Sequence, residues 1–254
     1  MNKIFKENIM QINEQRFKSE LSRIFKENGL ASLLDIEKSE KFLALTKRML
    51  EENQKYNLTA ITEPSKIILN HYADCVTLSA RLPKGAKIID VGCGAGFPTL
   101  PLAIVRDDIS IVAMDSTAKR IAYVDTTAKM LGLSNVTAIA MRAEDGARLA
   151  EYRESFDFAT ARAVAELRVL TELCLPYVKV GGYMIAMKGK NAEFELATAK
   201  KAIATLGGRA AKVESVRLTG GAEELSHPLI IIEKKTKTPA TYPRPYSQIS
   251  KKAL

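Results

Sequence analysis

The segment that most constrains this chain runs from residue 87 to residue 98 and reads Lys-Ile-Ile-Asp-Val-Gly-Cys-Gly-Ala-Gly-Phe-Pro. An apolar β-type start, three closely spaced glycines and a second apolar run are typical of a strand, a tight turn and a helix. Glycines are needed where the backbone bends sharply and comes close to a ligand, and the start of the following helix offers free N–H groups. The pattern therefore predicts a ligand-binding turn at the end of a strand.

The spacing of these glycines indicates which ligand the turn binds. A dinucleotide-binding turn follows Gly-x-Gly-x-x-Gly, and its third glycine would fall at position 97, which is Phe97. The observed Asp-x-Gly-x-Gly-x-Gly resembles motif I of the class I methyltransferases that use S-adenosylmethionine. The next strand-like run, residues 110–114, ends in Asp115, where a carboxylate can accept hydrogen bonds from both ribose hydroxyls; the alternative is an ordinary solvated strand end. The two features together favour S-adenosylmethionine and assign these residues to its site: Asp90, Gly92, Gly94, Gly96 and Asp115.

The composition indicates a folded chain with no metal or disulfide framework. Its 254 residues, 46% hydrophobic and 26% charged, are enough for a full core in one large domain, or in one domain with an extension. Cys75, Cys93 and Cys174 form no Cys-x-x-Cys pair, so neither zinc nor a disulfide is predicted and a reducing cytoplasm fits. No signal peptide is visible, and no uncharged apolar stretch is long enough to span a bilayer. We therefore expect a soluble, cytoplasmic protein without a bound metal.

Residues 1–86 show helical periodicity and are predicted to form an N-terminal helical extension. The first helix ends at Gly29, and the second ends near Gln54. A third helix opens at Pro64, because proline is favoured in a first turn, and carries apolar side chains as far as Leu78.

From Lys87 to residue 235 the period changes to short β runs that alternate with helices, which predicts a parallel sheet covered on both faces. Only a short Thr219-Gly220-Gly221 segment separates the last two runs, so these should pair antiparallel. The expected fold is α/β and Rossmann-like, with a seven-stranded, mostly parallel sheet whose last strand is antiparallel, as in class I methyltransferases. The predicted strands are 87–91, 110–114, 136–140, 156–161, 183–188, 212–217 and 228–233.

The chain carries a net charge of +9 at a pI near 9.4, which favours an anionic partner such as a nucleic acid. Residues 236–254 are predicted to be a basic C-terminal tail, and the stretch from Lys234 onward contains no acid. Three prolines in this tail, at positions 239, 243 and 245, argue against a helix and for an extended, mobile segment. Contact with phosphate and a solvated terminus that touches nothing are both open.

Residues that follow the third and fourth predicted strands suggest a chemistry. Ala143 and Glu144 are placed to hold an adenine amine, although an acid-rich helix start is the plain alternative. Around Arg162 there is no Asn or Asp followed by Pro-Pro and an aromatic residue, the pattern of amino-group methyltransferases, and Cys174 lies in an apolar helical run unsuited to cytosine C5 chemistry. What remains includes ring nitrogens that already carry a lone pair, above all guanine N7, which needs no general base. Arg162 would then hydrogen-bond guanine O6, a phosphate or the methionine carboxylate, unless it forms a structural salt bridge.

At these residues the chain resembles the RsmG (GidB) family of bacterial 16S ribosomal RNA guanine-N7 methyltransferases over about residues 40 to 235. The resemblance implies that Gly92, Phe97, Ala143, Glu144 and Arg162 line the S-adenosylmethionine pocket. It also implies that Asn57, His71, Arg162 and Lys188 face the methyl-transfer centre or the RNA. The matching motifs are Tyr56-Asn57-Leu58-Thr59, His71-x-x-Asp74, Asp90-Val-Gly-x-Gly-x-Gly-Phe-Pro98, Asp115-Ser116-x-x-Lys119-Arg120, Arg162-Ala163 and Met187-Lys188-Gly189.

Each of these residues also has a structural interpretation: Asn57 as a turn after a helix, His71 as a core histidine, Lys188 as a solvated strand end. His227 is interpreted as structural. Thr99 departs from the family, which usually has glycine there, and its hydroxyl is expected to cap the helix that starts at this point.

The resemblance implies 16S rRNA or the small ribosomal subunit as partner, and we expect a monomer. Three other function classes stay open: a nicotinamide oxidoreductase, which the glycine spacing opposes; a methyltransferase acting on another RNA, a protein or a small molecule; and a non-catalytic RNA-binding protein that keeps the cofactor pocket.

Overall fold

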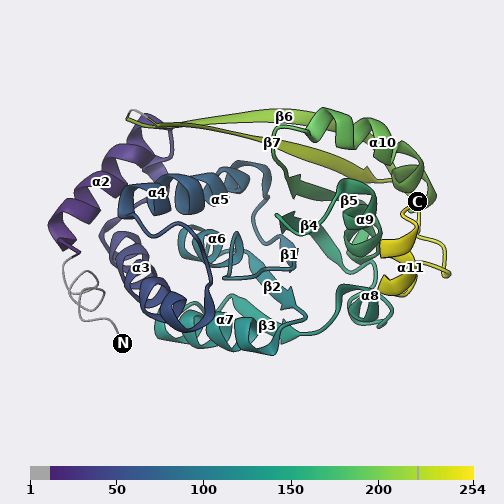
Figure 1. Ribbon diagram of the computed structural model, residues 1–254, viewed down its shortest axis with the longest axis horizontal. Coiled ribbons are helices and arrows are strands. Elements are labelled where there is room, and N and C mark those ends of the chain that lie inside the picture. Colours follow the sequence, from purple (N-terminus) through teal and green to yellow (C-terminus); the bar gives the residue numbers. More distant parts are fainter. Residues whose placement is uncertain (1–11, 222) are drawn as a thin grey trace.

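The computed structural model describes residues 12–221 and 223–254 (Figure 1). Its centre is a seven-stranded sheet with strand order β3-β2-β1-β4-β5-β7-β6. β1 to β5 pair in parallel, and β7 runs antiparallel to both of its neighbours, β5 and β6. This is the fold predicted from the sequence, with one antiparallel strand. The strands are β1 Lys87–Val91, β2 Ser110–Asp115, β3 Val136–Ala140, β4 Phe156–Arg162, β5 Val178–Met187, β6 Gly208–Gly220 and β7 Glu223–Lys234.

Helices cover both faces of the sheet because alternate side chains of the central strands point to opposite sides. On β1, Ile88 belongs to one buried apolar cluster, whereas Ile89 and Val91 belong to the other. The first cluster includes side chains of α6 (Thr99–Val105) and α7 (Ala118–Met130), and the second includes those of α9 (Leu167–Cys174) and α10 (Ala192–Thr205). The short α8 (Ala143–Gly146) follows β3.

The N-terminal helices pack on the same core as α6 and α7. They are α2 (Glu14–Glu27), α3 (Ile36–Tyr56) and a continuous helical stretch made of α4 (Pro64–Ile67), η2 (Ile68–Ala73), α5 (Asp74–Val76) and η3 (Thr77–Arg81). α3 continues to Tyr56, two residues beyond the predicted end, and stops at Asn57, which adopts a left-handed conformation. η2 is a π-helical turn, a local widening that is frequent at functional sites.

The hairpin of β6 and β7 is much longer than predicted and reaches from the sheet to the N-terminal helices (Figure 1). Near its tip, the Asn28 side chain accepts a hydrogen bond from the Thr219 N–H and donates one to the Thr219 carbonyl, at 2.8 and 2.7 Å. The outer part of the hairpin is held by backbone pairing, by these bonds and by Leu218, which is buried in the core, with Leu225 packed against the same cluster. Apolar side chains are sparse along this part of the hairpin, so hydrophobic periodicity missed its length.

The prediction of an extended C-terminal tail is wrong. α11 (Tyr246–Lys251) forms directly after Pro245, which occupies the N-cap and so does not interrupt the helix. Arg244 pairs with the fully buried Glu172 of α9 at 2.6 Å. Lys234 is also fully buried, and its ammonium donates to the Leu175 carbonyl at 2.7 Å. The tail packs against α9 and the segment after α8 (Figure 1), where Arg244 bonds to Glu172 and the Pro243 carbonyl accepts from Arg148. Arg244 of the tail and Lys234, the last residue of β7, are therefore both committed to contacts within the protein.

Among the described residues, no helix is long and apolar enough to cross a membrane. In the same part of the chain, no group of three or more His, Cys, Asp or Glu side chains is arranged to hold a metal ion.

Candidate active site

The glycine turn joins β1 to α6 at the carboxyl edge of the sheet. Gly92, Gly94 and Gly96 all have positive φ, at 75°, 56° and 84°, a conformation that disfavours other residues. A Cβ on Gly92 would lie 2.7 Å from a methyl of Val164, and one on Gly96 would lie 2.6 Å from Leu100. A Cβ on Gly94 would meet only the Gly92 carbonyl, at 4.0 Å. The turn therefore presents bare backbone to open space at Gly94.

The buried side chain of Asp90 supports the glycine turn. Its side chain is fully buried, and Oδ2 accepts hydrogen bonds from the Thr99 hydroxyl at 2.6 Å and the Thr99 N–H at 3.3 Å. Burial raises the pKa of Asp90 to about 7, and the bonds from Thr99 oppose the rise. Asp90 thus ties β1 to the start of α6, and its predicted contact with a cofactor stays a prediction.

The expectation that Thr99 caps α6 is wrong. Pro98 occupies the N-cap position and no side-chain cap bond forms there, because the Thr99 hydroxyl, at the first helical residue, turns inward to Asp90.

Asp115 ends β2 and contacts the same turn. Its Oδ2 accepts from the Gly94 N–H at 3.1 Å, and its Oδ1 accepts from the Thr117 N–H at 2.8 Å. Each carboxylate oxygen has a second lone pair, so the carboxylate can hold the turn and still accept hydrogen bonds from a ligand.

The segment after β3 lies beside Asp115, since the Met141 N–H donates to the Asp115 carbonyl at 3.0 Å. The Tyr177 hydroxyl fixes this segment by donating to the Ala143 carbonyl at 2.6 Å. Glu144 is largely buried, with one oxygen 4.0 Å from the Arg142 guanidinium. The structure therefore brings Ala143 and Glu144 to the same edge as the glycine turn.

Arg162, the last residue of β4, is the centre of a polar cluster. One guanidinium nitrogen, Nη1, donates to the Asn70 carbonyl at 2.9 Å and to Asp74 at 3.3 Å. The other, Nη2, lies 3.0 Å from Nδ1 of His71. The guanidinium carbon is 5.2 Å from the centre of the Phe97 ring, on which the His71 ring also stacks at 4.5 Å. Phe97 thus joins the glycine turn to the Arg162 cluster.

His71 is largely buried and neutral. Burial and the nearby Arg162 charge lower its pKa to about 4. Nδ1 lies 3.0 Å from Nη2 of Arg162 and 3.2 Å from the Asn70 carbonyl, and Nε2 lies 2.9 Å from the Thr59 hydroxyl. Both ring nitrogens are therefore occupied by protein groups, and His71 fixes Arg162 in place.

Lys188 and Asn57 do not join the Arg162 cluster. The Lys188 ammonium donates to the Ala165 carbonyl at 2.7 Å and pairs with Glu195 at 2.6 Å, with only 10% of the side chain exposed. It fastens the loop that follows β4. Asn57 is exposed and left-handed; its nearest link to the cluster runs through the neighbouring Thr59, which bonds to His71.

Two functional candidates lie where the sequence assigned no role. Asp74 is almost fully buried and contacts both Arg162 and His227, at 3.3 and 3.2 Å. The signal for Asp74 was its position three residues after His71, which puts both side chains on one helix face. His227 gave no local signal, because β7 brings it to the cluster from far along the chain.

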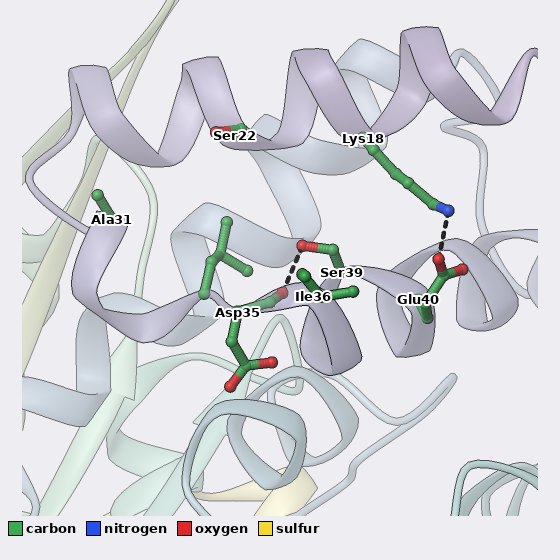
Figure 2. Close-up of a pocket in the computed structure, with 8 residues that line it drawn as sticks. Lys18, Ser22, Ala31, Asp35, Ile36, Ser39 and Glu40 are labelled. Carbon is green, nitrogen blue, oxygen red and sulfur yellow. Dashed lines mark hydrogen bonds and ion pairs between the residues drawn. The ribbon is translucent and has the colours of Figure 1, made fainter.

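A cavity of about 380 Å³ lies elsewhere, between α2 and the start of α3. Figure 2 shows Lys18 of α2 and Glu40 of α3 forming an ion pair beside it. None of the predicted site residues lines this cavity.

Comparison with known proteins decides the family. The family described as rRNA small subunit methyltransferase G (GidB) matches residues 38–224. The chain belongs to this family. The matched region contains every predicted site residue, from Asn57 to Lys188.

Relatives of this chain in the GidB family are similar over most of their length. The chain is 46% identical over 220 residues to the ribosomal RNA small subunit methyltransferase G of Clostridium perfringens, covering 86% of this chain and 91% of that one. It is 41% identical over 239 residues to the protein of the same name from Brevibacillus brevis, covering 93% and 99%.

Solved structures share the fold of this GidB-family chain at low identity. One is a SAM-dependent O-methyltransferase from Thermotoga maritima, with a TM-score of 0.53, 16% identity and coverage of 77% of this chain and 73% of that one. Another is the TYW2 protein of M. jannaschii in complex with AdoMet, with a TM-score of 0.51, 16% identity and coverage of 64% and 75%. Both show that this chain shares the fold of these two proteins.

Proposed function

We propose that this protein transfers the methyl group of S-adenosylmethionine to N7 of a guanine in 16S ribosomal RNA. The observation that carries the proposal is the contact of Phe97, a residue of the glycine turn, with His71 and Arg162. It joins a cofactor-type turn to a cluster of polar groups at one edge of the sheet. Membership of the GidB family supports the substrate class.

The residues of the turn fit S-adenosylmethionine, which supplies a methyl group on a positively charged sulfur. Gly94 leaves space for close approach of a ligand, and Asp115 is bonded to the Gly94 N–H, so its carboxylate is fixed beside that space. We assign Asp115 to the ribose hydroxyls, Ala143 and Glu144 to the adenine, and Gly92 and Phe97 to the walls of the pocket. Asp90 contributes indirectly, because its hydrogen bond with Thr99 holds the turn in place.

The protonation states at the site suit methylation at N7. Guanine N7 attacks with a lone pair that it already has, so no side chain must remove a proton. His71 and Asp90, two groups near the turn with shifted pKa values, are both buried and bonded to protein atoms. Neither is placed to accept a proton from a substrate. Catalysis then consists of positioning and electrostatics.

Arg162 is the residue we assign to substrate contact at this centre. A guanidinium group has five N–H donors, and three protein contacts of Arg162 are described, to Asn70, Asp74 and His71. The further donors suit guanine O6, a phosphate oxygen or the methionine carboxylate. They must not meet N7 itself, because a donor there would occupy the attacking lone pair. Asn57 and Lys188 contribute by shaping the loops on either side.

Incubation with labelled S-adenosylmethionine tests the proposal. The substrates are small-subunit RNA and small subunits from cells that lack the enzyme, with bulk protein and small-molecule fractions as controls. We expect label in the RNA and strand cleavage by alkali at a single 7-methylguanine. Label in protein or small molecules alone, or cofactor binding without transfer to RNA, would contradict the proposal.

We propose further that the protein acts as a monomer in the cytoplasm, where ribosomal subunits mature. The three cysteines are free and buried, which suits a reducing compartment. Light scattering after size exclusion tests the monomer, with a mass near 27.9 kDa expected.

A further inference from the structure

His227 reaches the candidate active site from the antiparallel strand β7. β5 pairs with both neighbours at the same point, since Met187 lies opposite Arg162 on one side and opposite Leu229 on the other. Just beyond that point, the Lys188 N–H donates to the Pro228 carbonyl at 3.0 Å. His227 therefore lies at the carboxyl edge of the parallel strands, where ligands of such sheets bind.

Asp74 joins His227 to Arg162. One oxygen of its carboxylate, Oδ2, is 3.2 Å from Nδ1 of His227 and 3.3 Å from Nη1 of Arg162. Only 1% of the Asp74 side chain is exposed, whereas 32% of the His227 side chain is exposed. The carboxylate is thus an internal anchor, and the two basic side chains lie between it and the surface.

The contact with Asp74 favours one tautomer of His227. The Asp74 carboxylate is an acceptor 3.2 Å from Nδ1 of the ring, so it favours the form in which Nδ1 carries the proton. In the neutral ring, Nε2 then has a free lone pair and acts as an acceptor. Among the described residues, no hydrogen bond to Nε2 of His227 is present. The partly exposed ring therefore offers an acceptor beside the donors of Arg162.

We propose that His227, oriented by Asp74, contacts the target nucleotide of the RNA by accepting a hydrogen bond at Nε2. This inference rests on the proposed function and deepens it. The donor is an N–H of the guanine or the ribose 2′-hydroxyl, because phosphate oxygens and guanine O6 are acceptors and would not pair with a lone pair. Arg162 and His227 together match a substrate that presents both acceptors and donors.

His227→Phe and His227→Gln test this assignment. Phenylalanine keeps a planar ring without an acceptor, whereas the glutamine amide oxygen can still accept. We expect His227→Phe to lower kcat/KM for the RNA at least about fivefold, while the Kd for S-adenosylmethionine and the Tm change little, because one hydrogen bond to substrate is lost. His227→Gln should restore at least half of that loss. Ser226→Ala, an exposed neighbour on β7, is the matched control and should behave as wild type.

A double-mutant cycle tests the link through Asp74. If Asp74 orients His227, Asp74→Asn with His227→Phe should cost less than the product of the two single effects on kcat/KM. Reconstituted subunits with a 2′-deoxyguanosine at the target then identify the donor: a His227→Phe defect that disappears on this substrate assigns the ribose hydroxyl, and one that persists assigns the base.

Two results would overturn the inference. One is a His227→Phe variant with wild-type kcat/KM for the RNA, and the other is a loss of cofactor affinity that accounts for the whole defect. Both require an active wild-type enzyme. Failure of the wild type to methylate small-subunit RNA would instead refute the proposed function, so the two failures are distinguishable.

Discussion

Asp90 shows how one buried carboxyl group can make the stability of this protein depend on pH. Burial raises its pKa in the folded protein to about 7, from an ordinary value of 3.8. The folded state therefore binds the proton more tightly than the unfolded chain does. The resulting stabilisation is complete below pH 3.8 and is lost as the pH rises through about 7.

Asp90→Asn should remove this dependence. The neutral amide has nearly the same shape, and its oxygen can still accept from Thr99. We expect the Tm of the variant relative to wild type to rise by more than about 2 °C between pH 5 and pH 8, which corresponds to ~1 kcal/mol. Thermal unfolding at several pH values measures it. A Tm difference that stays constant across this range would show that Asp90 does not titrate there.

Thr99→Val should destabilise the protein by about 1–3 kcal/mol, because it removes a hydrogen bond from a buried carboxyl group. Thr126→Val is the control, since Thr126 is exposed and its hydroxyl contacts only carbonyls of its own helix, those of Ala122 and Tyr123. That change should stay within about 0.5 kcal/mol. Denaturant unfolding compares the two, and equal effects would mean that the bond to Asp90 adds nothing.

Single residues also show where sequence reasoning stopped. The glycines and Asp115 could be assigned because turn chemistry and strand ends are local features. Thr99 was assigned to the wrong partner, since a hydroxyl at a helix start caps it in most contexts and here turns into the core instead. His227 was interpreted as structural, because its neighbour Asp74 is more than a hundred residues away in sequence and no local pattern indicates the contact.

The glycine turn is the element whose geometry is most directly testable. Gly94 and Gly85 both have positive φ, at 56° and 76°. Gly85 precedes β1 at the opposite end of that strand, and a Cβ there would meet nothing within 4 Å. Alanine at either position therefore suffers a similar backbone cost of ~1 kcal/mol. Only at Gly94 would the added methyl enter the proposed cofactor space.

Gly94→Ala should weaken S-adenosylmethionine binding about tenfold or more, as expected where a methyl group intrudes on a ligand contact worth ~1.4 kcal/mol. Gly85→Ala should lower the Tm by a similar amount and leave the Kd unchanged. Calorimetric titration of both variants measures the effect. Equal affinities would place the cofactor away from Gly94.

At the scale of elements, the predicted ends of a strand were correct where an apolar run defines the strand, and wrong where backbone pairing extends it. β1 and β3 begin and end at the predicted residues, 87–91 and 136–140, because apolar runs bounded by turn residues define them. β6 and β7 extend well beyond 212–217 and 228–233 because backbone pairing, which needs no particular side chains, continues where apolar residues such as Leu218 and Leu225 are few. η2 was not predicted, since hydrophobic periodicity does not distinguish a π-turn from an α-helix.

At the scale of the whole molecule, the net charge of +9 overstated what the tail can offer to RNA. Lys234 is fully buried and Arg244 is committed to Glu172. The tail follows β7, whose last residue, Lys234, pairs opposite Gly208 at the amino edge of the sheet. The proposed reaction centre is at the other edge. The composition indicates a negatively charged partner. Only the tertiary structure shows which basic side chains are already bonded within the protein.

Arg244→Gln should therefore act on stability. It leaves the Glu172 carboxylate fully buried without its cation, and removing one partner of a buried pair costs about 3 kcal/mol or more. The matched control is Lys251→Gln with Lys252→Gln, two exposed tail cations whose loss should change stability by less than about 0.5 kcal/mol.

Below its melting temperature, Arg244→Gln should bind RNA with the wild-type salt dependence, because this arginine releases no counterion from a phosphate. Filter binding at several salt concentrations, beside thermal unfolding, separates the two roles. A reduced salt slope with an unchanged Tm would show that Arg244 leaves Glu172 to contact the RNA.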